Sequence, residues 1–198
     1  MPASRVTPLL HHEVGVHLLT FVNGSKQGLN IFKRGLAGYE GVQEGLGVFA
    51  EWAVGGLTRT RLRLLAARVL AVDAMTDRAD FIEVFRLLRG EHGFSSQTAF
   101  LVAARVFRGG GFAKDAIYLR GFTNVLDGIA AGEALDLYWY GKIDRRHLGV
   151  VAELAERGLL HRPALVPEFM ADPDAAARIA AFRKDPSYAA LIRPEPAC

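Results

Sequence analysis

The sequence feature that most constrains the fold is a pair of histidines five residues apart, in His-His-Glu-Val-Gly-Val-His at residues 11–17. Metal-binding helices commonly place two histidines four residues apart, on one face. At five residues, a regular α-helix would separate His12 and His17 by about 140°, too far for both to bind one ion. A π-bulge adds one residue to a turn, and Gly15 would ease that distortion. The spacing therefore predicts a helix with a π-type irregularity between Glu13 and His17.

The residue types in and after this segment favour a zinc site. His12 and His17, with Glu44 of Gln-Glu-Gly-Leu-Gly (residues 43–47), supply two imidazoles and one carboxylate and leave a fourth position open for water. Zinc lowers the pKa of such a water, and Glu13 would take its proton during attack on a carbonyl carbon. The alternative is that the histidines are ordinary polar residues of an amphipathic helix. The short motif alone favours that alternative, because such motifs often match by chance.

Glu51 follows Glu44 by seven residues and therefore falls on a similar face of its helix. From that position its carboxylate would accept the outer N–H of a metal-binding histidine, which fixes the tautomer and orientation of the ring. The alternative is a solvated carboxylate or an ordinary ion pair with Lys or Arg. The sequence leaves both interpretations open.

Three motifs in order resemble the bacterial QEGLA-motif proteins, which are often described as flavohemoglobin expression-modulating. The motifs are the segment ending in residues 11–17, the segment 43–47, and Arg-Gly-Gly-Gly-Phe-Ala-Lys-Asp-Ala-Ile-Tyr-Leu-Arg-Gly at 108–121. These proteins are similar in turn to the eukaryotic tyrosine carboxypeptidases, which trim the C-terminal Tyr of α-tubulin through a His-Glu-x-x-x-His zinc site. The resemblance extends over residues 6–170, and with Glu44 it turns the balance in favour of the metal site.

The resemblance implies a mainly α, zincin-like metallopeptidase catalytic region with little β-structure. It implies His12, His17 and Glu44 as Zn²⁺ ligands and Glu13 as the catalytic acid and base. The implied activity is that of a carboxypeptidase that hydrolyses the C-terminal bond of a peptide or protein.

Three positions depart from the usual residues of this family: Val16 replaces Thr, Gly47 replaces Ala, and His11 replaces Gln. None of them removes a proposed ligand. Family members carry a long segment before the zinc helix, whereas this chain reaches the motif within its first 17 residues, so it resembles the C-terminal catalytic part. An alternative function is therefore a catalytically inactive, truncated regulatory or scaffold protein that retains the helical core.

Candidate substrate-binding residues occur in the third motif and just before it. Lys114 and Tyr118 are four residues apart, so they project from one face of a helix. A lysine close to zinc would pair with a terminal carboxylate, and a tyrosine hydroxyl would stabilise the oxyanion of the tetrahedral intermediate. Arg105 and Arg108 are weaker candidates for binding the carboxylate. The alternative is an exposed Lys114 and a Tyr118 that helps to build the core.

Composition limits the remaining possibilities. A chain of 198 residues with 51% hydrophobic residues can bury one sizeable core, which predicts a catalytic domain over 1–170 and a tail with a short helix over 171–198. No apolar run reaches the ~18 residues of a membrane span, and no signal peptide is apparent, so a cytoplasmic location is expected. The only cysteine is Cys198, which leaves His and carboxylates to hold a metal. The oligomeric state is not indicated.

The charge pattern argues against nucleic-acid binding. The net charge is only +3, and leucines interrupt the arginine run at 59–68, which is more typical of a solvated helix face. Capping and breaking residues predict helices that cover most of the chain. They are expected at 7–23, 39–54, from 58 onward, 81–89, 97–107, 114–131, 144–157 and 175–182, with a short strand at 137–140.

Overall fold

The computed structural model describes residues 3–108 and 114–191 of the chain. These residues are mainly helical and contain no strand, so the predicted mainly α fold class is confirmed. The chain forms two compact units: unit 1 comprises Met1–Thr58 and Arg120–Cys198, and unit 2 comprises Arg59–Leu119. Among the described residues, no helix has the length and apolar character needed to cross a membrane.

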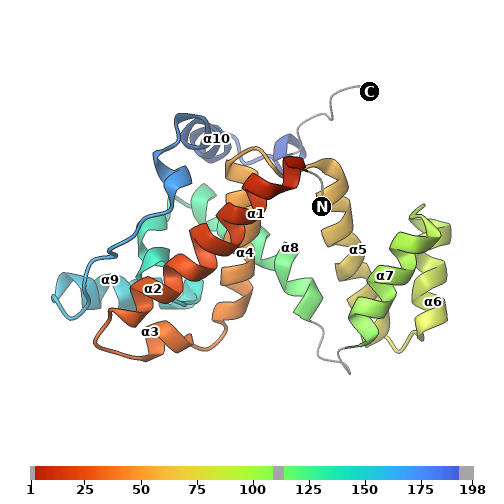
Figure 1. Cartoon of the computed structure of the whole chain (residues 1–198), viewed down its shortest axis with the longest axis horizontal. Coiled ribbons are helices and arrows are strands. Elements are labelled where there is room, and N and C mark those ends of the chain that lie inside the picture. Colours follow the sequence, from red (N-terminus) through yellow and green to blue (C-terminus); the bar gives the residue numbers. More distant parts are fainter. Residues whose placement is uncertain (1–2, 109–113, 192–198) are drawn as a thin grey trace. The chain divides into compact units, whose positions relative to one another are not determined.

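The first helix of unit 1 contains the predicted π-type irregularity. Helix α1 (Val6–His12), the π-helix η2 (Glu13–Leu18) and helix α2 (Leu19–Ser25) follow one another without a break and form one rod (Figure 1). The N–H of Leu19 donates to the carbonyl of Val14, five residues earlier, which is the hydrogen bond of a π-turn. The prediction made from the five-residue histidine spacing is therefore confirmed.

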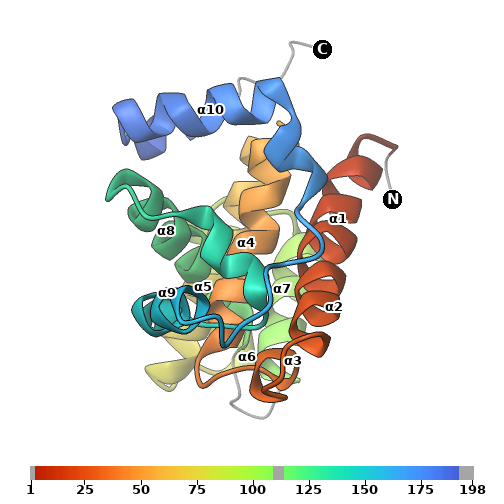
Figure 2. The same cartoon turned by 90° about the vertical axis from the view of Figure 1, so that its left-hand side faces the viewer.

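The short helix α3 (Ile31–Arg34) comes next in the chain and is followed by helix α4 (Tyr39–Ala53). Helix α4 packs along the rod (Figure 2). Its glycines allow close approach. A Cβ atom at Gly45 would lie 2.1 Å from the carbonyl carbon of Gly121 in helix α8 (Ile117–Ala130). The backbones of α4 and α8 therefore touch at a point where no side chain fits.

The rest of unit 1 covers these helices with short elements: η5 (Leu135–Tyr140), η6 (Arg145–His147), α9 (Leu148–Glu156), η7 (Glu168–Ala171), α10 (Pro173–Lys184) and η8 (Tyr188–Leu191). An aromatic cluster forms their common core, in which Phe49, Trp139 and Phe169 pack edge to face. Helix α10 contacts α4 and is the short helix expected in the tail.

The predicted strand at 137–140 is wrong, because these residues belong to the 3₁₀-helix η5. Tyr138, Trp139 and Tyr140 are all buried. A strand points successive side chains to opposite faces, whereas here three consecutive aromatic side chains all enter the core. Aromatic composition favoured a strand, but tertiary packing decided the local structure.

Unit 2 consists of α5 (Arg59–Thr76), α6 (Phe81–Arg86), the π-helix η3 (Leu87–Glu91), α7 (Ser96–Phe107) and η4 (Lys114–Ala116). Asp80 and Ser95 cap α6 and α7, each accepting a hydrogen bond from a backbone N–H of the first turn. Much of the core is alanine, which lets α5 and α7 pack closely: it comprises Ala67, Ala71, Val84, Leu88, Ala99, Val102, Ala103 and Val106. The glycines at 109–111 lie outside the described residues. The division into a domain over 1–170 and a tail over 171–198 stays a prediction.

Candidate metal centre

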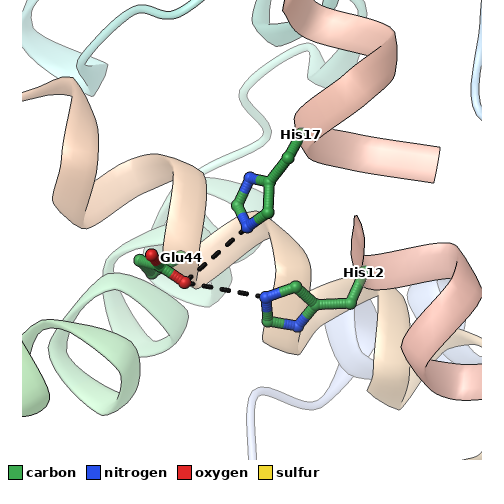
Figure 3. A group of neighbouring side chains, drawn as sticks. All are labelled: His12, His17 and Glu44. Atoms are coloured by element: carbon green, nitrogen blue, oxygen red, sulfur yellow. Dashed lines mark ion pairs between the residues drawn. The ribbon is translucent and has the colours of Figure 1, made fainter. Parts of the chain in front are cut away.

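Three side chains from two helices of unit 1 converge on one point (Figure 3). His12 ends α1, His17 belongs to the π-turn η2, and Glu44 lies in the second turn of α4. Glu44 Oε2 lies 3.6 Å from His12 Nε2 and 3.7 Å from His17 Nε2. One donor atom from each of the three residues lies within 4.8 Å of the others. The group has the composition and spacing of a metal site.

The π-turn brings the two imidazoles together. Their ring centroids are 5.0 Å apart and the ring planes are inclined by 74°. A regular α-helix would place the two side chains about 140° apart around its axis. The extra residue in the turn removes most of that angle, so both Nε2 atoms face α4. The local irregularity of the helix is therefore what assembles the group.

His12 is held on its outer side by a buried carboxylate. Its side chain is only 4% exposed, and its Nδ1 lies 2.9 Å from Oε1 of Glu51, which is fully buried in α4. Because a carboxylate only accepts hydrogen bonds, Nδ1 carries the proton and Nε2 faces Glu44. The guanidinium of Arg5 donates from Nη1 to the other oxygen of Glu51 at 2.8 Å.

A glycine makes the room for this imidazole. A Cβ atom at Gly47 would lie 2.5 Å from the His12 ring. The space that a methyl group would need at position 47 is thus occupied by His12. The departure from Ala at this position therefore has a direct structural consequence in this chain.

The surroundings of His12 change its proton affinity. Burial alone would lower its pKa, but hydrogen bonding to Glu44 and Glu51 and the negative charges of Glu51 and Glu13 outweigh burial and raise the pKa to about 9. Glu13 is exposed to solvent, and its negative charge is the smallest of the named causes that raise the pKa of His12.

His17 has a neutral and looser support. Its Nδ1 lies 3.4 Å from Oε1 of Gln43, and its side chain is 25% exposed. Gln43 is itself held by Thr20, whose Oγ1 lies 2.8 Å from the same amide oxygen and 2.8 Å from the carbonyl of Val16. The Nε2 atom of Gln43 is buried, with no hydrogen-bond partner among the described residues.

Comparison with known proteins assigns the chain to a family. A family model described as microtubule-associated tyrosine carboxypeptidase matches residues 1–186. The chain belongs to this family. No curated protein matches it. The resemblance inferred from the sequence motifs is thereby confirmed. Membership in the tyrosine carboxypeptidase family fits a zincin-like catalytic region and indicates a carboxypeptidase-type hydrolase whose substrates are protein C-termini.

The substrate-binding candidates of this carboxypeptidase family member all lie in unit 2, whereas the metal group lies in unit 1. Arg105 donates from Nε to the buried carboxylate of Asp115. Tyr118 has the guanidinium of Arg68 at 5.6 Å from its ring centroid, and Lys114 begins η4. Engagement of Arg105 by Asp115 satisfies part of its charge within unit 2. The roles of Arg105, Lys114 and Tyr118 in substrate binding stay predictions.

Sequence reasoning missed two residues that support the metal group: Gln43, which contacts His17, and Arg5, which contacts Glu51. Gln43 belongs to the motif that identified Glu44, yet its contact with His17 depends on how the rod and α4 cross. Arg5 lies seven residues before His12, so two helical turns separate them. That spacing was the available signal that Arg5 lies on the same side of the helix as His12.

Proposed function

We propose that the chain is a zinc-dependent carboxypeptidase in which His12, His17 and Glu44 hold Zn²⁺. The observation that carries this proposal is the convergence of one ligand atom from each of His12, His17 and Glu44 within 4.8 Å of one another, in a member of a carboxypeptidase family. Two imidazoles and one carboxylate are a known ligand set of catalytic zinc, with one position left for water or substrate.

The spacing of the donor atoms supports zinc. Bonds of about 2.0–2.1 Å in tetrahedral geometry place ligand atoms about 3.3 Å apart. The 3.6 and 3.7 Å separations from Glu44 Oε2 to the two histidines need only a small contraction to reach that value.

The unpaired amide nitrogen of Gln43 also supports binding through Nε2 of His17. In the observed orientation, Oε1 of Gln43 accepts from Nδ1–H of His17, which leaves the lone pair of Nε2 for a metal. If the amide were reversed, Nε2 of Gln43 would gain partners. It would then donate to Nδ1 of His17, so the imidazole proton would sit on the Nε2 atom of His17. The tautomer that a metal requires thus goes together with an amide nitrogen that has no hydrogen-bond partner among the described residues.

The proposed reaction is hydrolysis of the last peptide bond of a substrate. When bound, zinc polarises the scissile carbonyl and lowers the pKa of the attacking water. Glu13 takes a proton from that water at its carboxylate and delivers it to the nitrogen of the departing residue. Water adds across the C–N bond, so the products are a shortened chain with a new carboxylate and a free amino acid. Glu51 and Gln43 hold the imidazoles in the tautomer that the ligands need.

The proposal is tested with purified, zinc-loaded full-length chain and a set of peptides that differ only in the last residue. A C-terminal tyrosine is the first residue to test, because the matching family is described by that activity. An amidated copy of each peptide is the control, since a carboxypeptidase requires the free terminal carboxylate. Mass spectrometry measures loss of the last residue.

Two variants separate catalysis from metal binding. Glu13→Gln removes the proton-transfer group but none of the proposed ligands, so we expect bound zinc at the wild-type level and activity reduced by at least 10²-fold. His17→Ala should lose both zinc and activity. An unmutated chain that binds zinc but cleaves no peptide would instead favour the alternative of an inactive regulatory or scaffold protein.

A further inference from the structure

A buried ionic chain leads from the N-terminal turn of unit 1 to the metal group. The carboxylate of Glu51 is fully buried, and its two oxygens have different partners. Oε1 lies 2.9 Å from Nδ1 of His12, and Oε2 lies 2.8 Å from Nη1 of Arg5. Arg5 ends the 3₁₀-turn η1 (Ala3–Arg5) that precedes α1, and its side chain is 23% exposed.

Arg5 holds the buried carboxylate of Glu51 in place. A carboxylate without exposure to water is strongly disfavoured unless a cation and hydrogen bonds compensate it. Arg5 supplies a full positive charge on the oxygen that does not face the histidine. With that cation removed, the Glu51 carboxylate would lose the partner that holds Oε2 and would turn away from its present position, which disturbs the acceptor of the His12 Nδ1–H. The orientation of His12 therefore depends on a residue that does not touch it.

We propose that Arg5 is a positioning residue for the metal centre, acting through Glu51 on His12. Arg5 fixes the position and the rotamer of the Glu51 carboxylate, and Glu51 fixes the ring whose Nε2 faces Glu44. This inference rests on the proposed function, because it assigns Arg5 a role at the same metal site. It makes the turn before α1 part of that site.

The test measures zinc affinity rather than activity, by competition with a chromophoric chelator, on the full chain. Arg5→Ala should weaken zinc binding by about 10–100-fold, the usual effect of losing an outer partner of a metal ligand. Arg5→Lys retains the charge and should recover a large part of that loss, whereas Arg5→Gln should not. The visible absorption spectrum of the Co²⁺-loaded protein should change in Arg5→Ala, since it reports the geometry of the ligands.

A matched control removes another arginine of unit 1. Arg178 donates from Nη1 to the carbonyl of Ala53 near the end of α4, with no contact to Glu51 among the described hydrogen bonds. Arg178→Ala should leave zinc affinity and the Co²⁺ spectrum unchanged, even where it lowers the melting temperature.

A double-mutant cycle decides whether Arg5 acts through Glu51. In a Glu51→Gln background, Arg5→Ala should have little further effect on zinc affinity, because the charge that Arg5 holds is already gone. An equal loss in both backgrounds would overturn the proposal, as would wild-type affinity and spectrum in Arg5→Ala.

If Arg5→Ala does not fold, the contrast between Arg5→Lys and Arg5→Gln decides, and equal affinities in those two variants overturn the proposal. Failure of the unmutated chain to bind zinc would be a failure of the proposed function itself, and it is seen before any variant is made.

Discussion

The two histidines of the metal group receive opposite kinds of support. His12 is buried and faces the anionic Glu51, which is in turn paired with Arg5. His17 is one-quarter exposed and faces the neutral amide of Gln43 at 3.4 Å, which is in turn held by Thr20. One imidazole is fixed by a short, charged and dry contact, and the other by a longer and uncharged one.

This difference indicates that rigidity is concentrated at His12. Hydrogen bonds that involve an ionised group are shorter and about twice as strong as those between neutral groups. A carboxylate behind a ligating histidine also raises its basicity as a metal ligand. We therefore expect His12 to be the fixed corner of the site and His17 the adaptable one. The π-turn between them supplies the local freedom for that adjustment.

The largest expected effect is that of Glu51→Ala. It leaves the charge of Arg5 and Nδ1 of His12 without their buried partner, so the free energy of unfolding should fall by about 3–5 kcal/mol. Urea denaturation of chelator-treated protein measures this change. Glu153→Ala is the control, because Glu153 pairs with Arg157 on the surface, where both side chains are more than half exposed. That change should cost less than about 0.5 kcal/mol. Equal losses in the two variants would remove the distinction between the two sides of the site.

The next effect is a pH dependence that belongs to His12. In chelator-treated protein its pKa of about 9 keeps the ring protonated at neutral pH, so zinc has to displace a proton. Apparent zinc affinity should therefore rise by about tenfold per pH unit between pH 7 and 8.5. The raised pKa stabilises the chelator-treated protein fully below about pH 6.5, and this stabilisation is lost as the pH rises through about 9. Calorimetry of zinc binding in buffers of different ionisation enthalpy measures the proton that His12 releases. A zinc affinity that does not change with pH would contradict the support of His12 by a charged carboxylate.

A smaller effect is expected for Gln43→Ala. The variant loses the partner of His17 Nδ1, but it also removes an amide nitrogen that is buried without a partner. Zinc affinity should fall by about tenfold, the lower end of the range for such outer contacts. Gln27→Ala serves as the control, since the side chain of Gln27 bonds only the backbone of His161 among the described hydrogen bonds. Gln27→Ala should lower stability without changing zinc affinity. A loss in Gln43→Ala that exceeds the loss in Glu51→Gln would reverse the proposed order of the two supports.

The smallest effect is expected for Thr20→Val, which keeps the shape of the side chain and removes its hydroxyl. The hydroxyl oxygen lies 2.8 Å from the carbonyl of Val16, 3.2 Å from the carbonyl of His17 and 2.8 Å from the amide oxygen of Gln43, and only the Gln43 contact leads on to the His17 imidazole. Thermal unfolding should reveal a loss of about 1 kcal/mol, with zinc affinity changed by less than about threefold. A larger change in affinity would mean that the His17 side is as tightly coupled as the His12 side.

Sequence reasoning succeeded where one spacing admitted one physical solution. Two histidines five residues apart can share an ion only if the helix takes up an extra residue, and the π-turn at Glu13–Leu18 does so. The position of Glu51, seven residues after Glu44, indicated its face of the helix, but only the structure showed it buried against His12. Local rules thus identified the residues, and packing decided which of their contacts form.

Sequence reasoning failed where distant segments decided the outcome. The aromatic run at 137–140 is typical of a strand, yet it enters a core formed with Phe169 and becomes a 3₁₀-helix. The support from Arg5 and Gln43 depends on the angle at which two helices cross. The engagement of Arg105 by Asp115 depends on how η4 meets α7 within unit 2. None of these contacts has a period or spacing that a single sequence reveals.

The most direct test of the metal site is the zinc content of the purified chain beside His12→Ala and His17→Ala, by elemental analysis. We predict about one zinc per chain in the unmutated protein and loss of zinc in both variants, because a three-ligand site does not survive removal of one imidazole. Absence of zinc from the unmutated chain after zinc is supplied, or retention of zinc by both variants, would contradict the proposed site.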